Sequence, residues 1–162
     1  MAKSSLQEWS AVAEILSSVA VLATLVFFVL EIKQTNDAVR ANTYQDMAAM
    51  IVDFNAQFFE NPEVAEFIER TASEDYELTA IEAIRLRAMI SAQYRMMVNV
   101  YFQYTVGTIT EQRMKSLLYP AVLNFRRRGR MRIEWEEGED KFLLDPNFVE
   151  YLDKEIYETK SD

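Results

Sequence analysis

A long apolar segment near the N-terminus constrains this chain more than any other feature. It runs from Trp9 to Lys33 and reads WSAVAEILSSVAVLATLVFFVLEIK. About 16 residues between Glu14 and Glu31 carry no charge, and with their apolar neighbours they form a span of about 22 residues, or roughly 33 Å of helix. That length is enough to cross the hydrocarbon core of a bilayer. The segment therefore predicts a transmembrane helix.

The energetics of insertion support this interpretation. Eleven residues between Glu14 and Glu31 are Ile, Leu, Val or Phe, and together they contribute about −3 to −7 kcal/mol at mid-membrane. The two carboxylates themselves lie near the interfaces, where a charge costs less than at the centre. The alternatives are a helix buried in a soluble core and a cleaved signal peptide. A signal peptide is disfavoured because Glu8 and Glu14 stand where a basic region is expected.

Small residues lie along one face of this helix at spacings of four, three and four. They are Ala13, Ser17, Ala20 and Thr24, which we call the seam. In lipid, small residues let two helix backbones approach closely, and packing and interhelical hydrogen bonds then drive association. The seam predicts a homo-oligomer. The alternative is that Ala, Ser and Thr, which are common in single spans, align here by chance.

The rest of the chain contains signals for helices and no sustained strand pattern. Because neither Gly nor Pro occurs before Pro62, the apolar helix can continue to about Phe59, with a break at residues 33–37 as the alternative. Two further helix starts are indicated by an Asn or Asp before a proline, at Asn61-Pro62 and Asp145-Pro146. Two more are indicated by capping boxes, Thr79 to Glu82 and Thr108 to Glu111. Gly107 indicates the end of the helix that begins at Thr79.

We therefore predict an all-α fold in which a long N-terminal transmembrane helix continues into a small helical bundle. The expected organisation is an N-terminal tail over residues 1–8, a transmembrane helix over 9–33 and a helical soluble domain over 34–162. Orientation depends on few charges, with Lys3 on one side and Lys33 and Arg40 on the other. We expect the C-terminal domain to be cytoplasmic.

Composition excludes several classes of function. The chain has no His and no Cys, so thiolate or imidazole metal sites and Ser-His-Asp or Cys-His catalysis have no residues to use. Its three Gly stand apart and form no phosphate-binding loop. A net charge of −9 argues against binding nucleic acid, which needs a basic surface. We expect no cofactor, no metal and no catalysis, although a Mg²⁺ or Ca²⁺ site made only of carboxylates stays open.

One polar row is a candidate ligand site. Arg95, Asn99 and Gln103 recur at spacings of four among apolar residues, in a row that winds around the helix and so must pass partly beneath its neighbours. In a buried pocket, Arg95 would bind an anionic ligand that the two amides orient. The preferred alternative is structural, with Arg95 paired to a core carboxylate such as Asp46 or Asp53.

A second candidate is a basic run. It consists of Arg126, Arg127, Arg128, Arg130 and Arg132, and the acidic run EWEEGED follows it directly. Arginines near a bilayer can contact anionic headgroups. Because the two runs nearly cancel in charge, the preferred interpretation is that the acidic run is their intramolecular or intersubunit partner.

Several short motifs are shared with a known group of proteins. They lie at Gln34 to Arg40, Asn61 to Glu63, Tyr101 to Gly107 and Arg132 to Trp135. With these motifs the chain resembles, over nearly its whole length, a family of short bacterial proteins, common in marine proteobacteria, that have one N-terminal span and a helical domain. The resemblance implies this topology and a bacterial origin, and we therefore expect the chain to lie in the bacterial inner membrane. It supplies no catalytic residue.

The sequence thus favours a membrane-anchored, self-associating scaffold or accessory subunit of a membrane assembly. One alternative is a ligand sensor or carrier that uses the row at Arg95. Another is an oligomeric pore in which Glu14 or Glu31 forms a ring that selects cations.

Overall fold

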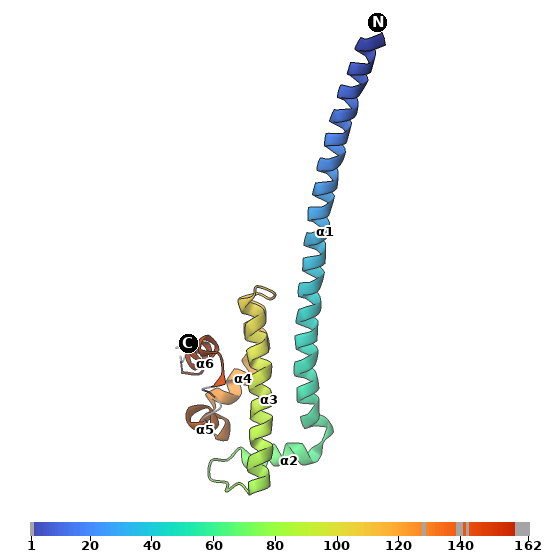
Figure 1. Cartoon of the computed structure of the whole chain (residues 1–162). Helices are drawn as coiled ribbons and strands as arrows, with labels where there is room; N and C mark the ends of the chain where they lie inside the picture. Colours follow the sequence, from blue (N-terminus) through green and yellow to red (C-terminus); the bar gives the residue numbers. More distant parts are fainter. Residues whose placement is uncertain (1, 128, 139–140, 142, 158–162) are drawn as a thin grey trace. The chain divides into compact units, whose positions relative to one another are not determined.

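The structure, a computed structural model, describes residues 2–127, 129–138, 141 and 143–157, and it is all-α, as the sequence predicts (Figure 1). No strand occurs within these residues. The helices are α1 (Ala2–Glu60), α2 (Pro62–Thr71), α3 (Ala80–Thr105), α4 (Glu111–Arg126), α5 (Arg130–Glu137) and α6 (Pro146–Tyr157).

Helix α1 is continuous from Ala2 to Glu60. The predicted single helix is confirmed, and the alternative break at residues 33–37 is absent. Most of the residues predicted as an N-terminal tail are helical as well, since the helix already begins at Ala2. The helix ends one residue before Asn61, because Pro62 disfavours helical backbone at the residue that precedes it.

The apolar part of α1 is long and apolar enough to cross a membrane. An 18-residue window within it has none of its residues buried. The side chains of Leu16 and Phe27, for example, are 64% and 66% exposed. A core helix of a soluble protein would bury most of its large apolar side chains. Within its own unit, the apolar segment therefore buries none of this surface.

The chain divides into two compact units, one that ends at Asn42 and one that begins at Thr43. The second unit therefore begins inside α1. The boundary predicted from sequence, between residues 33 and 34, marks where a lipid-embedded segment would end. The predicted boundary therefore describes the edge of a membrane span and not the edge of a compact unit, and it stays a prediction.

Helix α4 is central to the second unit, where it packs against α3, α5 and α6. Three rings meet in this core: the ring of Tyr94 lies 5.4 Å from that of Trp135 and 5.8 Å from that of Phe125. Each fully buried large side chain contributes about 1.5–3 kcal/mol to folding. The largest of them are Trp135, Phe125, Phe148, Met97, Met114, Leu118 and Leu152.

Most helix boundaries follow the predicted capping residues. Asn61 caps α2, and the Thr79 to Glu82 capping box at the start of α3 is fully formed. The predicted stop at Gly107 is close to the observed end, and Gly107 adopts a φ of +76° that favours glycine. One prediction is wrong: α4 is capped by Thr110, whose hydroxyl accepts a hydrogen bond from the Arg113 backbone N–H, and not by Thr108.

Candidate functional site

The predicted polar row lies on α3, but most of it is not buried. Arg95 and Asn99 are exposed, and Gln103 is half-buried. Arg95 and Asn99 line two open grooves of about 550 Å³ and 580 Å³. Of these three residues, neighbouring segments therefore cover Gln103 in part and leave Arg95 and Asn99 open. Ligand binding by the three residues stays a prediction.

The alternative partners predicted for Arg95 are not observed either. Among the described residues, no ion pair joins Arg95 to Asp46 or Asp53, and both carboxylates are exposed. Asp145 lines one of the two grooves together with Arg95. An exposed arginine beside an open groove contributes little to folding, because water screens its charge.

The four seam residues are all exposed on α1. The Thr24 hydroxyl donates a hydrogen bond to the Ala20 carbonyl at 2.9 Å, within the same helix. This bond satisfies the Thr24 donor locally, as is usual for Thr in helices. The seam therefore suits the close approach of two helix backbones better than it suits hydrogen bonds between helices. Self-association through the seam stays a prediction.

Two arginines of the basic run connect segments that are distant in the chain. The Arg126 Nε donates to the Glu155 carbonyl at 2.7 Å, and its Nη2 lies 3.4 Å from the Glu155 carboxylate. The Arg130 Nη2 donates to the carbonyls of Ser73, Glu74 and Tyr76, the last at 2.5 Å. These bonds tie α4 to α6 and the start of α5 to the loop after α2. The partners of Arg126 and Arg130 lie outside the acidic run.

Arg132 is the arginine that does pair with the acidic run. It forms an ion pair with Glu136, donates to the Phe125 carbonyl at 3.3 Å and stacks 4.2 Å from the centre of the Tyr157 ring. Arg127 is exposed. Arg128 lies outside the described residues. The intramolecular interpretation therefore holds for Arg132, and contact of this run with lipid stays a prediction.

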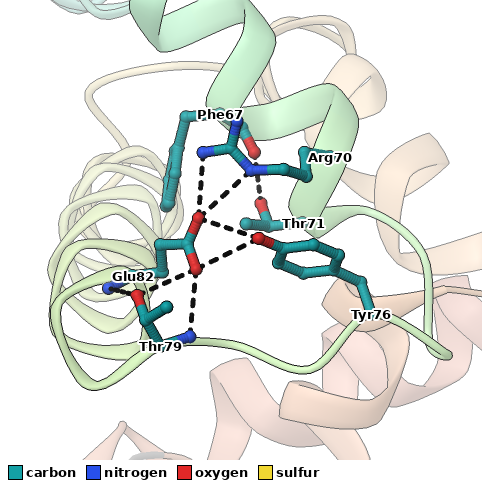
Figure 2. A network of polar contacts seen from close by, with 6 residues as sticks. All are labelled: Phe67, Arg70, Thr71, Tyr76, Thr79 and Glu82. Carbon is teal, nitrogen blue, oxygen red and sulfur yellow. Dashed lines mark hydrogen bonds and ion pairs between the residues drawn. The ribbon is translucent and has the colours of Figure 1, made fainter.

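The densest polar network surrounds Glu82 at the start of α3 (Figure 2). Its Oε1 accepts hydrogen bonds from the Arg70 Nη2 at 2.9 Å and from the Tyr76 hydroxyl at 3.2 Å. Its Oε2 accepts from the Thr79 backbone N–H at 3.0 Å and from the Thr79 hydroxyl at 2.9 Å. The capping box predicted the contact with Thr79. Nothing in the sequence pattern indicated Arg70 or Tyr76.

This network determines the chemistry of the Glu82 carboxyl. Hydrogen bonds from the Thr79 backbone and hydroxyl, helped by Arg70, lower its pKa from 4.5 to about 2. A carboxylate with such a pKa stays ionised near neutral pH and is a poor proton acceptor. Glu82 therefore holds α2, the following loop and α3 together, and it is unsuited to acid–base catalysis.

We expect Glu82→Gln to remove part of the acid sensitivity of folding. A carboxyl with a lowered folded-state pKa stabilises the folded state above its unfolded pKa, and this contribution is lost as the pH falls from about 4.5 toward 2. At pH 7 the variant should melt about 5 °C or more below the wild type. Below pH 2 the two should converge. Thermal unfolding from pH 2 to pH 7 measures both effects.

Glu111→Gln is the matched control for this experiment. Glu111 also has a lowered pKa, through an ion pair with Lys115, but both side chains are at least half exposed. Such a surface pair contributes little. A pH dependence changed equally by the two substitutions would contradict a special role for Glu82.

Comparisons with known proteins found no relative of this chain. No protein family, curated protein or solved structure matches the chain. The family resemblance of the sequence stays a prediction. The part of the chain that the structure describes is all-α, and its helix α1 is long and apolar enough to span a membrane.

Proposed function

We propose that this chain is a single-pass membrane protein whose helical domain acts by contact, as a self-associating scaffold or accessory subunit of a membrane assembly. The supporting observation is the unburied apolar window of α1. A contiguous apolar surface of this size is unfavourable in water and calls for a lipid or protein partner. The bilayer is the partner that matches the length and composition of the helix.

The family resemblance and the charges beside the span support the proposed location. We place the chain in a bacterial inner membrane, with the C-terminal domain in the cytoplasm. Lys33 and Arg40 lie on the C-terminal side of the span, and positively charged residues favour the cytoplasmic side. The absence of His and Cys from the sequence favours a non-catalytic role.

We expect the detergent-extracted protein to form a homo-oligomer that Ala20→Leu dissociates. A leucine at this position of the seam separates helix backbones that would otherwise approach closely. The expected result is at least a tenfold rise in the dissociation constant, equivalent to about 1.4 kcal/mol per interface. Light scattering coupled to size-exclusion chromatography gives the mass of the particle, and resonance energy transfer between labelled chains gives its affinity.

Ser18→Leu is the matched control. It places the same bulk on the same helix, well away from the seam, and should leave the particle unchanged. A wild type that stays monomeric at all concentrations would contradict self-association. A stable complex with a second protein, recovered from native membranes after cross-linking, would favour the accessory subunit over the homomeric scaffold.

A further inference from the structure

A cleft of about 690 Å³ lies within the second unit, apart from the predicted row at Arg95. Its walls come from the end of α1, from α2, from α3 and from the junction between α4 and α5. Its volume falls within the range of small-molecule sites. Two of its lining residues, Arg127 and Arg130, belong to the basic run. Its other lining residues belong to none of the surfaces described above.

One part of the cleft wall is apolar. Phe54, Ile68, Met89 and Met131 line it, from four different segments. Three of them, Ile68, Met89 and Met131, also pack against the buried core, which holds that part of the wall in place. Methionine side chains adapt to ligands of varied shape. This wall suits the apolar body of a small molecule.

Gln93 supplies an unpartnered polar group in the cleft. Its side chain lines the cleft and is only 7% exposed, yet its amide has no hydrogen-bond partner within the part of the chain that the structure describes. The amide is not among the fully buried polar atoms that lack a partner, so it keeps some access to solvent and its N–H groups are available to a ligand. A ligand in the cleft would accept a hydrogen bond from this amide.

The charged groups of the cleft favour an anion. Arg130 lines it, and its buried Nε has no hydrogen-bond partner among the described residues, although its Nη2 is bonded to carbonyls. Arg127 also lines the cleft and makes no ion pair in the described chain. Glu69 is the acidic residue of the lining and is exposed. The lining is thus net positive in a protein of net charge −9.

We propose that this cleft binds an organic monoanion with an apolar body, such as a medium-chain carboxylate. The apolar body packs on Phe54, Ile68 and Met89. The carboxylate accepts hydrogen bonds from the guanidinium groups of Arg127 and Arg130, and the Gln93 amide donates a further one. Hydrogen bonds in which one partner is ionised are stronger than those between neutral groups.

Equilibrium dialysis with radiolabelled octanoate tests the proposal on the full-length protein in phosphatidylcholine nanodiscs, with empty nanodiscs subtracted. We expect saturable binding of one octanoate per chain. Arg127→Gln and Gln93→Leu should each lower the affinity for octanoate about tenfold, because each removes one hydrogen bond to the charged carboxylate. Glu69→Gln should strengthen binding, because it removes the opposing charge. Octan-1-ol should compete at least tenfold less well than octanoate.

Arg87→Gln is the control, since it removes an exposed arginine of α3 that lines a different groove and does not line the cleft. Absence of saturable binding overturns the proposal, and so does an octanoate affinity unchanged by both Arg127→Gln and Gln93→Leu in variants whose melting temperature matches the wild type. Repeating the titration in phosphatidylglycerol nanodiscs distinguishes the sources of the anion. Weaker octanoate binding there identifies an anionic lipid as its competitor, and equal binding identifies a soluble carboxylate.

Discussion

Replacing Leu22 and Leu25 together with arginine is expected to move the full-length chain from the membrane pellet to the supernatant in alkaline carbonate extraction. Both side chains are exposed on α1, near the middle of the predicted span. Two arginines at the centre of a transmembrane helix cost about 5–7 kcal/mol on insertion scales. This cost is comparable to the about 3–7 kcal/mol that the eleven large apolar side chains of the span contribute. Insertion should therefore fail in most molecules.

Val39 and Val52 provide a matched control on the same helix. They are also exposed, at 54% and 64%, but they lie outside the predicted span. Arginine at both positions should leave the chain in the pellet. Release of the wild-type chain by carbonate would contradict the membrane proposal, because a helix embedded in lipid resists this treatment. Retention of the Leu22 and Leu25 double variant would show that something other than the span holds the protein.

The long helix was predictable because its determinants are local. No Gly or Pro interrupts the chain before Pro62, and the Asn61-Pro62 pair both ends α1 and starts α2. The start of α4 was not predictable from spacing alone. The backbone N–H of Thr108 donates to the Gln103 carbonyl at 2.9 Å, so Thr108 belongs to the turn that ends α3. The cap of α4 moves to Thr110 as a consequence.

Helix α5 is the element that sequence reasoning missed. Its N-cap is Gly129, with no side-chain hydrogen bond, and Trp135 is its one described residue that is fully buried. A single buried residue gives no helical periodicity, and the charged run around it resembles a solvated segment. Contact with α4 positions this helix. Its existence therefore depends on tertiary packing more than on local signals.

The candidate sites show the same limit. The sequence indicated that polar residues of α3 wind around the helix, but it could not show which of them the neighbouring helices cover. The structure buries Gln93 and leaves Arg95 exposed. The cleft beside Gln93 combines α1, α2, α3 and the junction between α4 and α5. No local pattern links these segments, because only the fold brings them together.

Trp135→Ala is expected to cause the largest loss of stability of any single substitution in the second unit. The side chain is 0% exposed, and its ring contacts those of Tyr94 and Phe125 with centroids 5.4 Å and 5.9 Å away. Its Nε1 donates to the Asp153 Oδ1 at 2.7 Å, which joins α5 to α6. Truncating a buried tryptophan costs about 3–5 kcal/mol. Because whole domains are stable by about 5–15 kcal/mol, much of this unit should unfold near physiological temperature.

Two further substitutions separate ring volume from hydrogen bonding. Trp135→Phe keeps most of the ring and loses the bond to Asp153, whose carboxylate retains an ion pair with Lys141 at 3.0 Å, so we expect a loss of about 1–2 kcal/mol. Trp9→Ala is the matched control, since Trp9 is 74% exposed and its loss should change the stability of this unit by less than about 0.5 kcal/mol. Denaturant unfolding of the full-length protein in detergent, followed by circular dichroism and limited proteolysis, compares all three. A Phe variant as unstable as the Ala variant would mean that the link from α5 to Asp153, rather than the packed ring, dominates the stability of this core.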